Sequence, residues 1–165
     1  MVIGTLFVHF LDDFSRFTWF YPLKKKSDVF STFIKFKTLI ENKFGHKIKA
    51  LQTDWGGEYR QLSAFCDSQG IIHRRSCPHT HEQNGKAERK HRHITEIGLT
   101  LLAHACMPLS FWDDAFATAV YLINRLPTKV LNFSSPLTTL HGKAPDYLFI
   151  FPFCSCSFFR SWSPT

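Results

Sequence analysis

The stretch that decides the fold reads LQTDWGGEY, residues 51–59. Residues alternate in character from Lys47 to Thr53, which predicts a β-strand that delivers Asp54 to its carboxyl end. The glycine pair at 56–57 then lets the chain turn away sharply. Ligands of open α/β sheets bind at this end of the strands. An Asp before glycines is more often a simple turn residue, so this stretch alone does not establish a site.

The segments before this stretch predict a hairpin and a helix. Residues 2–10 and 17–23 are β-rich and flank a polar turn, so we expect two paired strands. Apolar residues then recur with helical spacing, which predicts a helix over 28–44 that Gly45 ends. The members of this stripe are Val29, Phe33, Phe36 and Ile40.

The segments after it predict further alternation of helices and strands. A short helix over 62–68, a short strand over 71–73 and a polar loop over 76–85 are expected in that order. A long helix over 86–105 follows, and another helix begins at Pro108 and ends before Pro127. No element is predicted beyond about residue 132. This order indicates a layered α/β domain with a mixed sheet.

Composition narrows the class of protein. The 165 residues suffice for one domain with a real core, and the 44% hydrophobic content argues against disorder. The net charge of +7 favours a polyanionic partner, because basic residues release counterions from phosphates. No apolar run approaches the length of a membrane span, and the first residues lack the layout of a signal peptide. We therefore expect an intracellular protein with no membrane partner.

Cysteine and histidine usage argues against a zinc site. The five Cys residues are odd in number and contain no Cys-x-x-Cys pair, so neither a disulfide framework nor zinc spacing is predicted. Several histidines between residues 73 and 93 are scattered over predicted strand, loop and helix. Because no Cys stands at ligand spacing from them, we predict no structural zinc.

A second chemical constellation reads EQNGKAERKHRH, residues 82–93. Glu88 falls in the first turns of the predicted long helix, where a carboxylate suits the helix dipole. Basic residues crowd the same segment, at Arg89, Lys90 and Arg92. The residue types alone fit a solvated charged face and a phosphate-binding face about equally well.

A series of short motifs resembles the catalytic core of copia-type retrotransposon integrases, in order and over roughly residues 5–147. These motifs are DDFSRFT (12–18), TDWGGEY (53–59), GIIH (70–73), CPHT (77–80), QNGKAER (83–89), FW (111–112), AVYLINRLP (119–127) and GKAPDY (142–147). The resemblance implies a ribonuclease H-like fold, in which helices flank a five-stranded mixed sheet. It also implies two Mg²⁺ or Mn²⁺ ions held by three carboxylates.

The resemblance assigns two of those carboxylates. Asp54 matches the second and Glu88 the third, so both are expected to be catalytic and to bind metal. The family's first Asp lies on a strand before the one predicted at 2–10, so we expect this chain to lack that strand and that ligand. Asp12 and Asp13 match a turn of the family and are weak substitutes. The expected site is therefore two-thirds complete.

The resemblance also suggests nucleic-acid contacts. Asn84 and Gly85 match a flexible loop before the catalytic helix. Arg92, one helical turn past Glu88, is the preferred phosphate contact, and Lys86 and Lys90 are secondary candidates. The family usually has Thr-Pro where this chain has Thr80 and His81, so we expect a looser loop here.

The implied function is DNA integration by a polynucleotidyl transferase that forms part of a polyprotein. Its partners would be element DNA ends and target DNA; the parent enzyme would be a nuclear homo-oligomer and would take no small-molecule substrate. With the first Asp missing, we expect negligible strand transfer from residues 1–165 alone. One alternative is a non-catalytic remnant or DNA-binding module of the same fold. Another is a ribonuclease H-type hydrolase, which the QNG motif at 83–85 disfavours.

The expected domain organisation has three parts. Residues 1–131 form the catalytic core, and residues 132–148 form a connector. Residues 149–165 form an irregular tail in which the family pattern is lost. We interpret that loss as a shifted reading frame or as gene decay.

Overall fold

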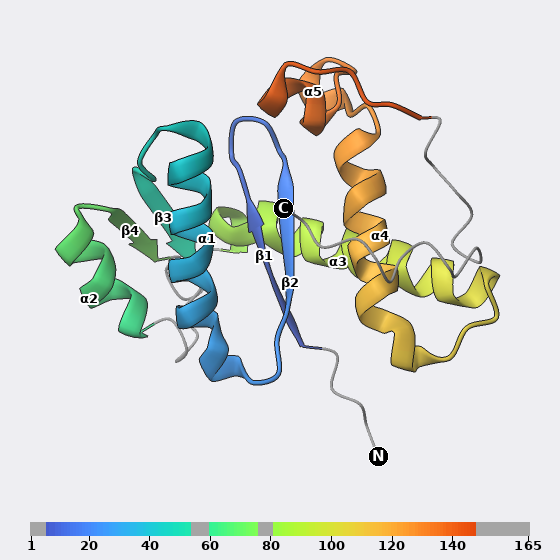
Figure 1. The fold of residues 1–165 in the computed structure, drawn as a ribbon, viewed down its shortest axis with the longest axis horizontal. Helices are drawn as coiled ribbons and strands as arrows, with labels where there is room; N and C mark the ends of the chain where they lie inside the picture. Colours follow the sequence, from blue (N-terminus) through green and yellow to red (C-terminus); the bar gives the residue numbers. More distant parts are fainter. Residues whose placement is uncertain (1–5, 54–59, 76–80, 148–165) are drawn as a thin grey trace. The chain divides into compact units, whose positions relative to one another are not determined.

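The computed structural model describes residues 6–53, 60–75 and 81–147 (Figure 1). These residues divide into two compact units. The described part of the first unit comprises 6–8, 21–53, 60–75 and 81–89, and that of the second comprises 9–20 and 90–147. Both units contribute residues to the N-terminal hairpin.

The hairpin consists of β1 (Phe7–Leu11) and β2 (Thr18–Pro22), which form a two-stranded sheet. The backbone N–H of Asp12 donates to the carbonyl of Phe17 at 2.9 Å, which closes the turn between the strands. The predicted hairpin is confirmed. Its first strand begins at Phe7, whereas the prediction began at residue 2, and residues 2–5 lie outside the described part of the chain.

Helix α1 (Val29–Phe44) dominates the first unit, and a 3-10 turn, η1 (Lys26–Asp28), precedes it. Its predicted apolar stripe supplies three buried residues, Val29, Phe33 and Phe36. Gly45 ends the helix in the left-handed conformation, with φ of 66°, and its N–H donates to the carbonyl of Glu41 at 2.9 Å. Glycine adopts this conformation without a Cβ clash, which explains why the helix stops there.

Two parallel strands form the sheet of the first unit. β3 (Ala50–Thr53) pairs with β4 (Ile72–Arg75) in a register that places Thr53 opposite Arg75. Helix α2 (Arg60–Gln69) lies between them in sequence and buries Leu62 and Cys66. The strand, short helix and strand predicted here are confirmed, with boundaries moved by one to three residues. The expected single mixed sheet appears in the described residues as two separate two-stranded sheets.

Helices make up most of the second unit. They are the end of α3 (His81–His104), η3 (Leu109–Phe111), α4 (Trp112–Arg125), η4 (Lys129–Leu131) and α5 (Pro136–His141). Helix α5 falls within the segment predicted as a connector, where no helix was expected. Ser135 caps it by accepting a hydrogen bond from the N–H of Thr138 at 3.1 Å, and Pro136 occupies its first turn.

The long helix α3 begins at His81, five residues before its predicted start at 86. The prediction of a loop over 81–85 was therefore wrong. With His at position 81 in place of the family's Pro, nothing in this segment forbids helical backbone. Gly85 costs a helix only about 1 kcal/mol relative to Ala, which the rest of a 24-residue helix readily offsets.

Helices α3 and α4 meet through a glycine. Gly98 is buried, and a Cβ added to it would overlap the ring of Phe116. The ring is 2% exposed, so it packs directly against the backbone of α3. Other buried apolar side chains of this core are Ile94, Leu102, Ala115, Ala119, Val120 and Ile123.

A buried amide ties the hairpin to α4. The N–H of Thr18 donates to Oδ1 of Asn124 at 2.9 Å, and Nδ2 of Asn124 donates to the carbonyl of Thr18 at 2.8 Å. Both residues are at least 96% buried. The side chain thus pairs both polar groups of one backbone position, as a neighbouring strand would.

Candidate functional site

The first candidate carboxylate follows β3 directly. β3 ends at the buried Thr53, and Asp54, the next residue, lies outside the described part of the chain. Thr53 stands opposite Arg75 at the carboxyl ends of two parallel strands. Side chains that follow such strands share one edge of the sheet, which is the usual ligand edge of α/β proteins.

A histidine braces this end of β3. Nε2 of His73 lies 2.9 Å from Oγ1 of Thr53, and Nδ1 lies 2.9 Å from Oγ of Ser63. A neutral imidazole has one donor and one acceptor nitrogen, so it can link two hydroxyl groups at once. His73 on β4 therefore connects the last residue of β3 to helix α2.

This brace was missed when the sequence was considered alone. His73 was considered only as a zinc ligand and set aside. The GIIH motif at 70–73 was the available signal, because it belongs to the resemblance and ends on this residue. Ser63 offered no signal, since an isolated Ser on a short helix is common.

The second candidate carboxylate, Glu88, is exposed on α3. Because α3 begins at His81, Glu88 is its eighth residue and lies in the third turn. The interaction of a carboxylate with the helix dipole fades beyond the first turn. A favourable interaction with the helix dipole therefore does not explain why a glutamate stands at position 88.

The five candidate nucleic-acid contacts differ in exposure. Lys86 and Arg92 are exposed, whereas Lys90 is half-buried. Burial lowers the pKa of Lys90, and the charge of Arg16 lowers it further. Gly85 is buried, and the described side chains near it include that of Arg89, which reaches back one turn.

The fifth candidate, Asn84, lies within α3, and its side chain is outside the described part of the structure. The expectation that Asn84 and Gly85 form a loop before the helix was wrong, because both are helical. Their backbone groups therefore belong largely to the helix and are not those of a mobile loop.

The two histidines of the basic segment do not add to its charge at neutral pH. Burial lowers the pKa of His91 and of His93 below the ordinary 6.5. For His93 the charge of Lys90 lowers the pKa further, and Glu96 opposes that effect. The positive charge of this face therefore comes from its Lys and Arg residues.

The other acidic residues considered have local roles. Oδ2 of Asp12 accepts hydrogen bonds from N and Oγ of Ser15, at 2.7 and 2.6 Å. Asp13 pairs with Arg16 at 2.7 Å. Both carboxylates thus stabilise the hairpin turn. Within residues 6–53, 60–75 and 81–147, no group of three or more His, Cys, Asp or Glu side chains is arranged to hold a metal ion.

The side chains of Asp54 and Glu88 are nevertheless suitable ligands for a hard divalent ion. Both offer carboxylate oxygens, which Mg²⁺ and Mn²⁺ prefer. Glu88 is exposed, so its oxygens can reach a ligand.

No helix in the described part of the chain has both the length and the apolar character needed to cross a membrane. No protein-family model matches the chain. Individual proteins do match, and they fall into one group.

The sequence relatives are retrotransposon polyproteins. The chain is 52% identical over 151 residues to the retrovirus-related Pol polyprotein from transposon RE2 of Arabidopsis thaliana, across 91% of the chain. It is 54% identical over 141 residues to that from transposon RE1 of the same plant, across 86% of the chain. It is 45% identical over 143 residues to that from transposon TNT 1-94 of Nicotiana tabacum. The chain spans about a tenth of the length of these relatives.

The solved structures with a similar fold are retroviral integrases. A simian T-cell lymphotropic virus intasome, in complex with a PP2A regulatory subunit, matches with a TM-score of 0.64 and 18% identity over 86% of this chain and 56% of that one. The HTLV-2 integrase catalytic core domain in complex with magnesium matches with a TM-score of 0.60 and 20% identity, over 83% of this chain and 93% of that one. The BIV integrase catalytic core matches with a TM-score of 0.59 and 16% identity, over 84% and 87%.

At these identities the structural matches establish the fold alone, which is the ribonuclease H-like fold of integrase cores. The sequence matches establish the homology. The chain is therefore an integrase-core-like segment, homologous to part of the Pol polyproteins of copia-type retrotransposons.

Proposed function

We propose that this chain contributes to DNA integration, as part of a polynucleotidyl transferase that joins the 3′ ends of element DNA to target DNA. Its proposed partners are element DNA, target DNA and further copies of the same core, in the nucleus. The proposed catalytic segment is residues 1–131, and 132–148 and 149–165 are the proposed connector and tail.

One observation carries this proposal: the strand that directly precedes Asp54 in sequence ends at a residue held by His73, and Glu88 stands exposed on α3. The fold that carries both features is shared with integrase cores. A charged helix face that is merely solvated requires neither the hydrogen bonds of His73 nor a second carboxylate after a strand end.

In the proposed site, Asp54 and Glu88 hold divalent ions through their carboxylate oxygens. When bound, paired Mg²⁺ or Mn²⁺ ions would supply charge stabilisation for the attacking and leaving oxygens of a phosphodiester. A fold neighbour solved in complex with magnesium supports this choice of ion. His73 holds the side chain of Thr53, the last residue of β3 and the one directly before Asp54 in sequence.

Cationic side chains of α3 are proposed to bind the DNA backbone. Arg92 remains the preferred phosphate contact, because it is exposed and its guanidinium can form two parallel hydrogen bonds with a phosphate. Lys86 is equally exposed. Lys90 is the weakest of the three cationic candidates, since it is half-buried. Asn84 and Gly85 are proposed to contact DNA through the backbone atoms of α3.

Manganese binding tests the proposed carboxylates. Electron paramagnetic resonance measures Mn²⁺ bound to the purified chain, for which we expect weak affinity, with a Kd of about 10⁻⁴–10⁻³ M. Asp54→Asn and Glu88→Gln should each lower the bound fraction several-fold. The matched controls are Asp67→Asn on α2 and Glu96→Gln on α3, which should leave it unchanged.

If both carboxylate variants bind Mn²⁺ as the unaltered chain does, the proposed metal site is wrong. The alternative, a DNA-binding module without catalysis, is favoured by the net charge of +7. It predicts DNA binding that is independent of Mn²⁺ and insensitive to Asp54→Asn. Fluorescence anisotropy of a labelled duplex, with and without Mn²⁺, separates the two functions.

A further inference from the structure

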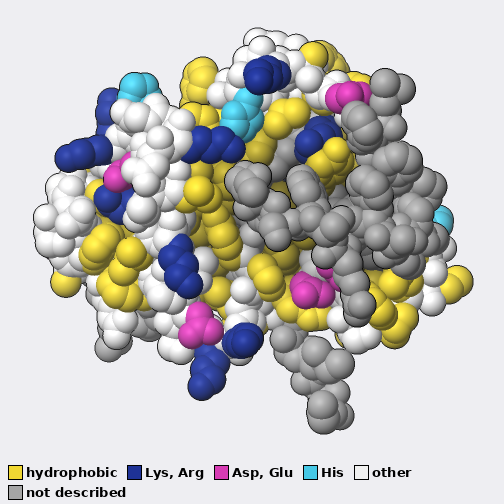
Figure 2. Space-filling view, in the orientation of Figure 1, with side chains coloured by type: hydrophobic (Ala, Val, Ile, Leu, Met, Phe, Trp, Pro, Cys, Tyr) yellow, Lys and Arg dark blue, Asp and Glu magenta, His cyan; other side chains and the backbone are white. Residues whose placement is uncertain are grey.

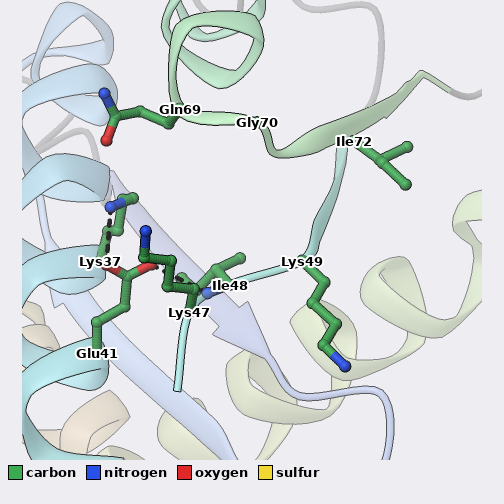
Figure 3. A pocket seen from close by; sticks show the side chains of 8 residues that line it. All are labelled: Lys37, Glu41, Lys47, Ile48, Lys49, Gln69, Gly70 and Ile72. Atoms are coloured by element: carbon green, nitrogen blue, oxygen red, sulfur yellow. Dashed lines mark hydrogen bonds and ion pairs between the residues drawn. The ribbon is translucent and has the colours of Figure 1, made fainter. Parts of the chain in front are cut away.

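A basic pocket opens in the first unit, at the other end of the parallel strands. It has a volume of about 440 Å³. Its walls come from the middle of α1, from the segment before β3 and from the junction between α2 and β4 (Figure 3). The lining residues are Lys37, Glu41, Lys47, Ile48, Lys49, Gln69, Gly70 and Ile72.

The single acidic residue of this lining is already neutralised. Oε2 of Glu41 pairs with Nζ of Lys37 at 2.8 Å, and Oε1 accepts a hydrogen bond from the N–H of Ile48 at 3.0 Å. The hydrogen bond from Lys37 holds the pKa of Glu41 below its ordinary value, against the opposing effect of burial. Glu41 therefore fixes one wall of the pocket and leaves little negative charge for a ligand to meet.

The remaining lysines supply positive charge that no described carboxylate pairs with. The three lysines and one glutamate of the lining sum to a formal charge of +2. Lys47 and Lys49 are both exposed. In Figure 3 the ammonium group of Lys47 points toward the space between Lys37 and Gln69, whereas that of Lys49 points away from it.

Two ammonium groups and a side-chain amide thus converge on one space. The ammonium groups of Lys37 and Lys47 are hydrogen-bond donors, which suits a tetrahedral oxyanion. The amide of Gln69 has both a donor and an acceptor, and Figure 3 draws its oxygen on the side of the lysines, so Gln69 donates to an anion only after its amide turns over. The described lining contains no aromatic side chain on which a base could stack. These features select a phosphate and offer nothing to hold a nucleoside.

We infer that this pocket binds a phosphodiester of a nucleic-acid backbone, with Lys47 in the pocket and Lys49 contacting the same strand outside it. The divergence of the two lysines favours a polymer over a free anion, because a small ion could engage only one of them. Lys and Arg side chains are dispersed over the face of the chain seen in Figure 2, in keeping with the net charge of +7.

The pocket is separate from the proposed metal site. Lys47 and Lys49 precede β3, whereas Asp54 follows it in sequence, and a strand of four residues spans roughly 13 Å. The inference therefore goes beyond the proposed function and adds a second DNA contact surface. It does not require catalysis.

The test compares two double variants with the same change in charge. Lys47→Gln with Lys49→Gln alters the pocket, and Lys35→Gln with Lys43→Gln alters exposed lysines of α1 outside it. Anisotropy of a labelled duplex is measured at several salt concentrations on the full 165-residue chain. We expect the pocket variant to bind about three- to tenfold more weakly and to reduce the magnitude of the log–log salt slope by about 1–2, against a markedly smaller change for the control.

Two further measurements distinguish a failure of this inference from a failure of the proposed function. Arg92→Gln tests the proposed contact on α3, so loss of binding there with no loss in the pocket variant overturns this inference and leaves the proposed function intact. Inorganic phosphate is titrated by calorimetry against the chain and the pocket variant. If the pocket variant loses phosphate binding but keeps its DNA affinity and salt slope, the pocket is a small-anion site and the inference is overturned. Circular dichroism melting confirms that all variants remain folded.

Discussion

A polar tie between distant segments is found in each of the two units, and the two ties differ in kind. In the second unit, the amide of Asn124 pairs both backbone groups of Thr18 and is fully enclosed. In the first unit, His73 links two side-chain hydroxyl groups and is only partly buried. The first tie replaces missing strand pairing, and the second holds the strand end that precedes a candidate ligand. The Asn124 tie therefore stabilises the fold, whereas the His73 tie positions the end of β3.

The largest effect is expected from breaking the enclosed tie. Asn124→Leu keeps the side-chain volume similar but leaves the N–H and C=O of Thr18 without partners. We expect the free energy of unfolding to fall by about 2–4 kcal/mol, because each unsatisfied buried group costs about 1–3 kcal/mol. Urea denaturation measures the change, and Asn42→Leu on the exposed face of α1 is the control. A loss below about 1 kcal/mol would mean that water reaches Thr18.

A matched pair of glycines tests how tightly the second unit is packed. Gly98→Ala places a methyl group into the ring of Phe116 and should cost about 1–3 kcal/mol of unfolding free energy. Among the described side chains, Gly85→Ala, on the part of α3 in the first unit, meets the movable guanidinium of Arg89 at 3.3 Å, and it gains helix propensity. We expect it to be neutral or to stabilise by up to about 1 kcal/mol. Thermal melting of both variants checks the ordering, and equal losses would contradict the close approach of α3 and α4.

The positioning tie should show a smaller loss of stability and a separate loss of function. His73→Phe removes both hydrogen bonds, and we expect unfolding to become easier by about 1–2 kcal/mol. If the brace positions Asp54, Mn²⁺ affinity should also fall at temperatures where the variant remains folded. His73→Gln can restore one bond and should recover part of that affinity.

A control of similar cost distinguishes positioning from general loosening. Leu62→Ala removes a fully buried side chain from α2 without touching the Thr53–His73 bond. It should destabilise the chain at least as much as His73→Phe while leaving Mn²⁺ affinity unchanged. Parallel losses of affinity in both variants would show that His73 acts through stability alone.

Short-range patterns were enough to predict most elements. The stripe on α1 and the glycine at 45 give both the buried face and the end of that helix, because each is decided by local geometry. The start of α3 was misplaced because no residue near position 81 breaks a helix, and the family's loop was expected there. Helix α5 was missed because six residues are too few to show helical periodicity. Ser135 and Pro136 together are nevertheless typical of a helix N-terminus.

In the candidate site, too, the sequence predicts what depends on neighbouring residues and misses what depends on the fold. Motifs can name Asp54 and Glu88, because those residues are recognised by their neighbours in sequence. The brace joins His73 to residues 10 and 20 positions away, and the pocket joins residues from Lys37 to Ile72. These segments meet only after β3 and β4 pair. No local pattern encodes such meetings. The half-burial of Lys90 likewise results from packing. It makes Lys90 a weaker candidate for a phosphate contact than the exposed Arg92, a difference that the sequence alone does not show.

The smallest expected effect concerns the histidines of α3 and their contribution to stability. Burial lowers the pKa of His91 and His93 in the folded chain, so the unfolded chain binds more protons once the pH falls below about 6.5. The stability is fully present above that pH and decreases as the pH falls through it toward the lowered pKa. The rings are exposed enough for solvent to screen them, so roughly a few tenths of a kcal/mol is expected. Urea denaturation between about pH 7.5 and pH 5.5 should show a steeper loss for the unaltered chain than for the His91→Gln and His93→Gln double variant. Identical pH dependence would mean that these two rings titrate alike in the folded and unfolded chain, and that their burial on α3 contributes nothing to the stability of the second unit.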